Sequence, residues 1–193
     1  MLEPTDETVY PTQSIGVLPE KNAKLPDASS FSVTLPEEFL PDATPGRYVC
    51  RRWPLDAANI TVEVTVLSEE PKYTNAEKRE MEARGEKVQR VVRDYTDLTA
   101  AVFEEAANAA LSDGLSFKVK SFVHTTTRRA SDGVSFPGFR IGAELSGGLK
   151  PVTEEIHIVL SDDRIFTVTY AQASDDEFDE LFKKSAATIT VYE

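Results

Sequence analysis

The sequence predicts a single α+β domain, and three observations support this. Segments of alternating apolar and polar residues recur along the chain, as in β-strands with one buried face. Two segments, 97–114 and 174–186, instead repeat apolar residues at helical spacing. The length of 193 residues and the 40% share of hydrophobic residues suit one domain with its own core.

The chain opens with residues 1–30, which show no period and contain four prolines. This pattern predicts an extended N-terminal arm or linker, with the domain covering 31–193. Three strands are expected next: residues 31–35, stopped by Pro36; residues 46–54, stopped by Pro54; and residues 59–67. The third has the clearest alternation, with Ile60, Val62, Val64 and Val66 on one side and Thr61, Glu63 and Thr65 on the other.

A charged insertion follows at about 71–96. Thr74 and Glu77 have the spacing of a capping box, which favours a helix. Gly85 interrupts the helical pattern, and the residues after it suit an exposed strand equally well. A charged helix, an exposed strand and a mobile insertion all stay open for this segment.

Residues 97–114 predict a helix that Asp97 caps and Gly114 closes. Helical geometry places one broad apolar face on this segment, and the many alanines suggest close packing onto a sheet. The residues expected on that face are Leu98, Val102, Phe103, Ala106, Ala109 and Ala110. Glu104, Glu105 and Asn108 are expected on the opposite, solvent-facing side.

Four further strands are predicted at 117–123, 134–145, 154–160 and 164–172. Pro137 and Gly138 predict a bulge in the second of them. Ser161-Asp162-Asp163 predicts a tight hairpin between the last two.

The acidic stretch from Ser174 predicts the start of a second helix. Ser174 and Glu177 have capping-box spacing, and acidic residues in the first turn favour the positive end of the helix dipole. The apolar stripe is expected from Phe178, Leu181 and Phe182, and Lys183 and Lys184 fall in the last turn. A short final strand is expected at 189–191.

These segments together resemble the PsbP-like superfamily. The similarity lies in "FSVTLPEEF", "YVCRRWP", "NITVEVTV" and "SDDRIFTVTYAQASDDEFDELFKKSAATITV", and it covers roughly 30–66 and 97–192. It is closest to small uncharacterised Firmicutes domains of that type. The resemblance implies an antiparallel β-sheet of about six or more strands with helices packed on it. It also implies a non-catalytic domain, since the superfamily includes a photosystem II subunit, a Ran-binding import factor, bacterial lipoproteins and secretion chaperones.

Composition excludes several classes of partner. The 21 basic and 33 acidic residues give a formal net charge of −12, which disfavours nucleic acids and anionic membranes. The single cysteine permits no intramolecular disulfide. No signal peptide or transmembrane segment is apparent, which predicts a cytoplasmic protein as written. The expectation becomes extracytoplasmic, or a lipoprotein, if Met1 is not the native start.

No catalytic or cofactor-binding residue is predicted. The acidic cluster at 175–180 lacks the ligand spacing and turn glycine of a calcium loop, so no metal is expected there. No nucleophile motif lies near His124 or His157, so both are expected to be ordinary strand histidines. Cys50 is expected to be a small buried side chain rather than a reactive thiol.

The function predicted is a non-enzymatic binding domain that engages a protein partner through a sheet face or a sheet–helix groove. Arg51, Arg52 and Trp53 are the candidate interaction residues, because Arg and Trp are enriched at interface hot spots. Arg128 and Arg129 are expected to lie at a solvated hairpin tip. The alternative is a small-ligand or cation-binding accessory module of a bacterial surface protein, and an unrecognised hydrolase ranks last.

Overall fold

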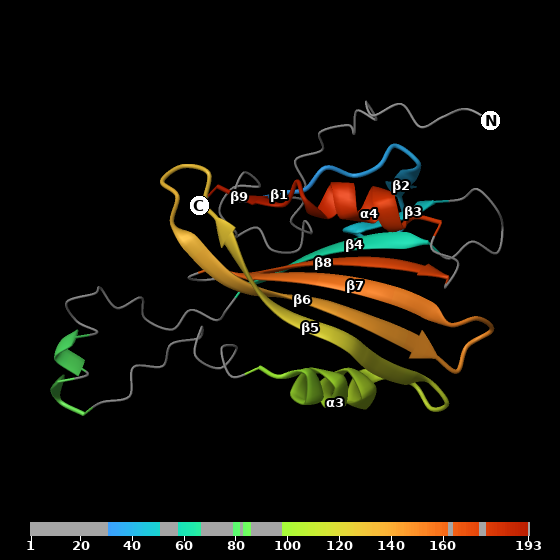
Figure 1. The fold of residues 1–193 in the computed structure, drawn as a ribbon, viewed down its shortest axis with the longest axis horizontal. Coiled ribbons are helices and arrows are strands. Elements are labelled where there is room, and N and C mark those ends of the chain that lie inside the picture. The colour runs from blue at the N-terminus through green and yellow to red at the C-terminus, as the bar shows by residue number, and fades with distance from the viewer. Residues whose placement is uncertain are drawn as a thin grey trace.

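The computed structural model describes residues 31–50, 58–66, 79–81, 83–85, 98–161, 164–173 and 177–192. Its centre is a seven-stranded sheet in the order β2-β3-β4-β8-β7-β6-β5, and all its neighbours pair antiparallel (Figure 1). The strands are β2 (Phe39–Pro41), β3 (Arg47–Cys50), β4 (Asn59–Val66), β5 (Ser116–Arg128), β6 (Ser135–Ser146), β7 (Val152–Leu160) and β8 (Arg164–Ala173). The predicted α+β class with an antiparallel sheet is therefore confirmed.

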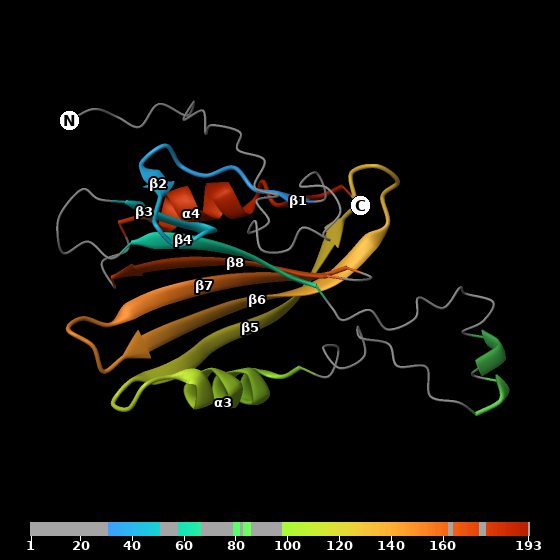
Figure 2. The ribbon, with the colours of Figure 1, turned by 180° about the vertical axis from the view of Figure 1, so that it is seen from behind.

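Two helices lie on opposite faces of this sheet. Figure 1 shows α3 (Ala100–Ala110) below it and α4 (Asp179–Ala186) above it, and Figure 2 shows the same layers from behind. A two-stranded ribbon of β1 (Phe31–Ser32) and β9 (Thr190–Val191) lies on the α4 side. None of the helices in the described part of the chain is long and apolar enough to cross a membrane.

Each face of the sheet has its own hydrophobic core. The alternation along β8 shows the division, because Phe166, Val168 and Tyr170 belong to the α4-side core and Ile165 to the α3-side core. On the α4 side, Phe178 and Phe182 pack their rings against Phe39 and Tyr170. The α3-side core contains Phe117, Phe139, Ile141, Ala143, Ile156, Ile158, Leu160 and Ile165.

The strand predictions are largely confirmed. In β4, Ile60 and Val62 are buried while Glu63 and Thr65 are exposed, as the alternation predicts. β1 is shorter than predicted, although Val33 and Leu35 beyond it are still buried. β2 was not predicted: its three residues follow a turn and are too few to show a period.

The predicted bulge at Pro137 and Gly138 is wrong. β5 and β6 pair in unbroken register there, and the irregularity lies in β5 between Val119 and Ser121. Gly138 instead permits a close approach of strands, because a Cβ on it would lie 2.1 Å from the Ile158 carbonyl oxygen. The hairpin tip predicted at Arg128 and Arg129 is confirmed, since β5 ends at Arg128 and the turn closes with the Val134 carbonyl accepting from the Arg129 N–H.

The start of α4 differs from the prediction. The helix begins at Asp179 with Phe178 as its N-cap residue, so Glu177 precedes the helix and the prediction that the helix starts at Ser174 is wrong; Ser174 itself lies outside the described residues. Gln172 of β8 substitutes for a local cap, because its amide oxygen accepts from the Phe178 N–H at 2.9 Å and its nitrogen donates to Asp179. The apolar stripe and the basic last turn are as predicted.

For α3, the predicted boundaries and four of the six residues predicted on its apolar face are wrong. Thr99 is the N-cap, its hydroxyl accepting from the Val102 N–H, and the helix ends at Ala110 with Leu111 as its C-cap, three residues before Gly114. Asp97 lies outside the described residues. The side facing the α3-side core consists of Leu98, Phe103, Ala107 and Leu111. Val102, with 52% of its surface exposed, faces solvent instead, as do Ala106, Ala109 and Ala110.

The charged insertion is described only in part. Residues 79–81 and 83 are helical, and Gly85 follows them in a turn with a φ of +73°. The N-terminal arm at 1–30 lies outside the described residues.

Candidate interaction surface

The residues predicted to bind a partner, Arg51, Arg52 and Trp53, lie outside the described residues. They directly follow Cys50, the last residue of β3. Cys50 is 1% exposed and belongs to the α4-side core, so its predicted role as a small buried side chain is confirmed.

The two histidines lie on opposite faces of the sheet. His124 packs against Phe122 and Phe139 on the α3 side, with ring centroids 5.8 and 5.1 Å away. His157 points to the α4 side, where its ring meets Tyr170 edge-on. Both histidines lie within strands, His124 in β5 and His157 in β7.

His157 forms a hydrogen-bonded pair with Glu155. Its Nε2 lies 2.7 Å from Glu155 Oε1, and this bond holds the pKa of Glu155 below its ordinary value, with smaller contributions from nearby cations. The Tyr170 ring that His157 meets carries a buried hydroxyl, which bonds the Ser185 hydroxyl, and Ser185 in turn donates to the Thr34 carbonyl. Within the described residues, no serine is hydrogen-bonded to His157.

The Glu155–His157 pair borders a part of the sheet that the described elements leave uncovered. The cross-strand register sets Val123 of β5 opposite Arg140 of β6, and Arg140 opposite His157 of β7. Directly opposite residues share a face, so all of them lie on the α4 side. We call this surface the open face; it comprises Ser121, Val123, Arg140, Gly142, Glu155 and His157.

Arg140 stands at the centre of the open face. It is exposed, and its positive charge helps to lower the pKa of Glu155, although its guanidinium forms no direct hydrogen bond within the described residues. Gly138 and Gly142, two residues away on either side, place no side chain beside it. Val123, 41% exposed, adds an apolar neighbour. The guanidinium thus keeps all its donors available on a surface with small neighbours.

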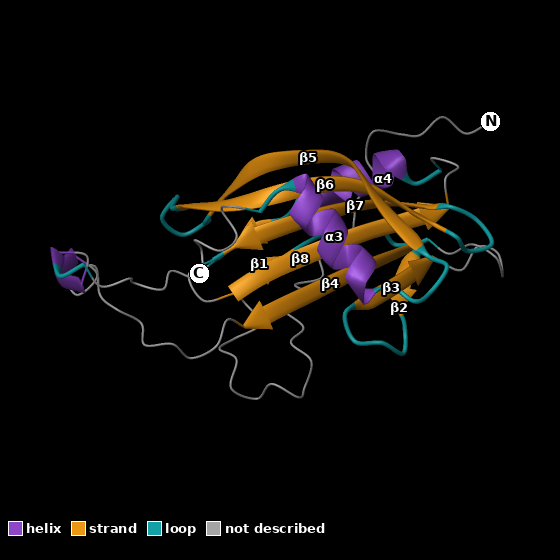
Figure 3. Ribbon diagram, turned by 90° about the horizontal axis from the view of Figure 1, so that it is seen from below, coloured by secondary structure: helices purple, strands orange, loops and turns teal. Residues whose placement is uncertain are grey.

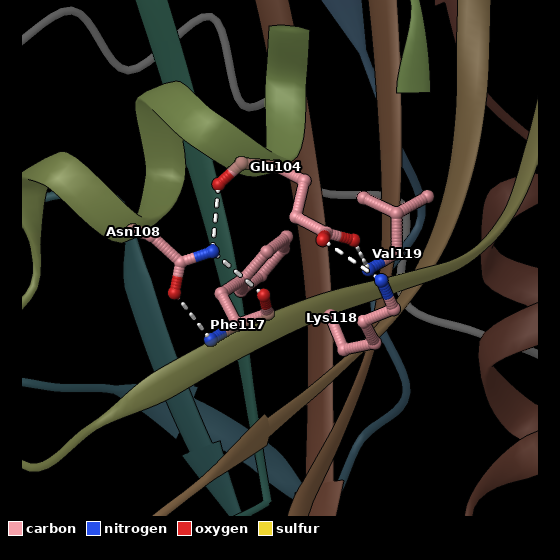
Figure 4. Close-up of polar contacts among 5 residues, drawn as sticks. All are labelled: Glu104, Asn108, Phe117, Lys118 and Val119. Atoms are coloured by element: carbon pink, nitrogen blue, oxygen red, sulfur yellow. Dashed lines mark hydrogen bonds and ion pairs between the residues drawn. The ribbon is translucent and has the colours of Figure 1, made fainter. Parts of the chain in front are cut away.

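A second group of polar side chains joins α3 to the edge of the sheet. Figure 4 shows Glu104 and Asn108 reaching from α3 to β5. The Asn108 amide donates to the Phe117 carbonyl at 2.8 Å and accepts from the Phe117 N–H at 2.9 Å. The Glu104 carboxylate accepts from the Val119 N–H at 2.8 Å and from Lys118 Nζ at 2.9 Å.

We call Glu104 and Asn108 the α3 clamp. The Asn108 amide offers β5 the same donor and acceptor that a neighbouring strand would offer. The Lys118 bond, followed by the bond from Val119, lowers the pKa of Glu104. The prediction that Glu104 and Asn108 lie on the side away from the sheet is therefore wrong, because both reach β5, although Asn108 is still exposed; Glu105 is exposed as predicted.

No metal centre is apparent in the ranges that the structure covers, because no three His, Cys, Asp or Glu side chains come close enough there to share an ion. Asp175 and Asp176 of the acidic cluster lie outside those ranges. Of the remaining members, Asp179 bonds Gln172, and Glu180 pairs with Lys183.

The fold defined by this sheet and its two helices is that of PsbP-like α+β domains. No family model matches the chain, and no curated protein matches it either. Among solved structures it is similar to cyanobacterial PsbP (CyanoP) from Synechocystis sp. PCC 6803, with 13% identity and a TM-score of 0.50 over 85% of this chain and 88% of that one. It also matches the Ran-binding protein Mog1p of Saccharomyces cerevisiae, with 10% identity and a TM-score of 0.42 over 85% and 91% of the two chains. The predicted PsbP-like fold is thus confirmed, and the relation to Firmicutes domains stays a prediction.

Proposed function

We propose that the protein is a non-enzymatic binding domain that engages a protein partner through the open face. The observation that carries the proposal is Arg140, an exposed arginine that stands between two glycines and close to the Glu155 carboxylate. Arginine is enriched among the residues that dominate binding energy, because its planar group can bond a carboxylate in bidentate fashion and also stack on aromatic rings.

The neighbours of Arg140 fit this role. Val123 supplies apolar area at the centre, and Glu155 and His157 supply a polar rim. Protein interfaces commonly combine an apolar or arginine-containing centre with a polar rim. Similarity in fold to CyanoP adds nothing about the partner, because function depends on the site and not on the fold.

The experiment is a quantitative comparison of bound proteins. Immobilised wild-type chain, the Arg140→Glu variant and the Lys150→Glu variant are each incubated with source-cell extract, and retained proteins are quantified by mass spectrometry. Lys150 lies exposed in the β6–β7 connection, so its variant makes the same charge change away from the open face. We expect at least one protein to be retained by wild type and Lys150→Glu, and to fall about tenfold with Arg140→Glu. Equal retention by all three would refute the proposal.

Arg51, Arg52 and Trp53 remain a second proposed contact. The Trp53→Ala and Arg51→Glu/Arg52→Glu variants belong in the same comparison, and unchanged retention would remove this segment from the proposal. For the domain organisation we propose an arm at 1–30, a single domain at 31–193 and an insertion at about 71–96. Limited proteolysis that left a stable fragment ending within 71–96 would contradict the single domain.

A further inference from the structure

The two edges of the seven-stranded sheet differ in length. One edge is β2, which has three residues and ends at Pro41. The other is β5, which has 13 residues (Figure 3). Short edge strands and edge prolines keep other chains from pairing with a sheet, so β2 is a poor template for a further strand. β5 is the edge on which such pairing has to be considered.

The α3 clamp establishes which backbone groups of β5 point away from the sheet. Phe117 and Val119 direct theirs outward, since both are bonded by α3. The irregularity between Val119 and Ser121 shifts the alternation by one residue. Beyond it, the outward N–H and C=O groups belong to Phe122, His124 and Thr126.

Pro137 supports this assignment independently. It lies opposite Thr126 in the register with β6. A proline has no N–H to give, so it fits a pair whose backbone groups do not bond each other. Pro137 also lies just beyond the last β6–β7 pair, which is Gly138 with Val159, so no bond to β7 is lost there.

Both ends of this edge are covered, and its middle is not. The α3 clamp bonds residues 117–119, and β9 reaches the other end, where the Val191 carbonyl accepts from the Ala130 N–H at 2.8 Å. Between them, the outward backbone groups of residues 122–126 make no hydrogen bond with any part of the chain that the structure describes. The side chains of His124 and Thr126 are exposed.

We propose that the β5 edge at residues 122–126 binds an extended, net acidic segment of a protein partner as an eighth strand. Main-chain hydrogen bonds supply the affinity in this mode, and alternate side chains supply the specificity. Phe122 and His124 would flank the added strand on the α3 face, and Val123 would flank it on the open face.

The charge of β5 selects the partner. The strand contains Lys118, Lys120, His124 and Arg128 and no acidic residue. Lys118 pairs with Glu104 and Lys120 with Glu144, so the exposed Arg128 is the cation of β5 that the described residues leave available beside the open edge. A second copy pairing through the same edge would bring together two chains of net charge −12, so it is disfavoured. An acidic segment meets complementary charge instead.

The test begins with the selection of random 12-residue peptides displayed on phage against the full-length chain. Enriched peptides are then synthesised and titrated against wild type, His124→Pro and His124→Thr. His124→Pro removes one outward N–H at a position where edge strands tolerate proline, and His124→Thr changes the side chain but keeps that N–H. We expect acidic peptides that weaken about tenfold on His124→Pro and stay within about twofold to threefold on His124→Thr.

Amide hydrogen exchange measured by NMR on the wild-type chain keeps the proposal testable if the proline variant does not fold. A bound peptide should slow exchange at Phe122, His124 and Thr126, and leave Val123 and Thr125 unchanged because these already bond β6. No enriched peptide, or equal binding to both variants, would overturn the proposal. Protection centred on Arg140 would also overturn it while supporting the open face, so the two proposals fail separately. Dimerisation of the wild-type chain that His124→Pro abolishes would assign the edge to a second copy and overturn the acidic segment.

Discussion

Replacing Asn108 by Ala should detach one end of α3 from the sheet edge. The Asn108 amide makes two hydrogen bonds to the Phe117 backbone and a third to the Glu104 carbonyl within the helix. At a net contribution of about 0.5–1.5 kcal/mol each, the two bonds to Phe117 stabilise the fold by about 1–3 kcal/mol. Alanine is the better helix former by about 0.6 kcal/mol, which offsets part of the loss. The free energy of unfolding should fall by about 1–2 kcal/mol.

Urea unfolding and amide exchange measure this effect. The matched control is Glu105→Ala, on the exposed side of the same helix, which should change stability by no more than about 0.5 kcal/mol. Exchange at the Phe117 amide should accelerate in Asn108→Ala and not in the control. Equal stability of the two variants, or unchanged exchange at Phe117, would show that the α3 clamp does not hold the edge.

Asn108→Asp sharpens the same prediction through its pH dependence. The substitution keeps the acceptor for the Phe117 N–H but turns the donor into an oxygen that faces the carbonyls of Phe117 and Glu104. The charged carboxylate is disfavoured there, so its pKa should rise in the folded state and stability should fall as pH rises through it. At pH 7 this variant should be less stable than Asn108→Ala, and the difference should shrink towards pH 4. A constant difference across that range would contradict the orientation of the amide.

Three further substitutions test the interior. Gly138→Ala should destabilise the fold by about 3 kcal/mol or more in thermal unfolding, because the added Cβ would lie 2.1 Å from a backbone carbonyl oxygen. The control is Gly148→Ala, which should be near neutral because the nearest atom to its Cβ is 3.8 Å away. Ser185→Ala removes two buried hydrogen bonds, one to the Tyr170 hydroxyl, and should lower the unfolding free energy by about 1–3 kcal/mol in urea. Burial raises the pKa of Glu154, so native stability falls as pH rises from the ordinary glutamate value through the raised one. Glu154→Gln should therefore gain stability relative to wild type at pH 7 and lose that gain near pH 4; a gain that is the same at both would refute the cause.

Alternation was sufficient to predict most of the sheet. β4, β7 and β8 each combine β-branched residues with apolar residues at a spacing of two. β2 was missed because three residues cannot establish a period. The bulge was misplaced because proline and glycine indicate that a strand has a local constraint, but not which constraint. At Gly138 the cause is the Ile158 carbonyl, which lies on a neighbouring strand 20 residues later.

The face of α3 could not be chosen from apolar spacing. Alanines occupy both sides of this helix, at Ala107 towards the core and at Ala106 and Ala109 towards solvent. They bury so little area that they hardly distinguish the two sides. One signal was present: Asn108 lies in the helix interior, where asparagine is a poor helix former unless its side chain has a specific partner. That partner, the Phe117 backbone, becomes apparent only when the strand is placed beside the helix. The cap of α4 could not be predicted for the same reason: Gln172 belongs to β8, and no local sequence pattern connects it to Phe178.

The protection of the two sheet edges bears on the proposal for β5. β2 is protected by its own sequence, through shortness and a terminal proline. β5 depends on other elements, with α3 bonding residues 117–119 and β9 covering the turn beyond Arg128. Its central residues, "FVHTTT", include no proline and no carboxylate, and valine and threonine favour pairing with a further strand. An edge strand of this composition promotes aggregation when it is unpaired, and it favours binding when a partner strand pairs with it. Substituting Thr126→Lys tests this proposal. It adds a positive charge to the exposed edge and keeps the backbone N–H, so binding of the acidic peptides should stay within about twofold of wild type or tighten, whereas His124→Pro weakens it about tenfold. A loss equal to that of His124→Pro would mean that side chains, and not the backbone edge, carry the interaction.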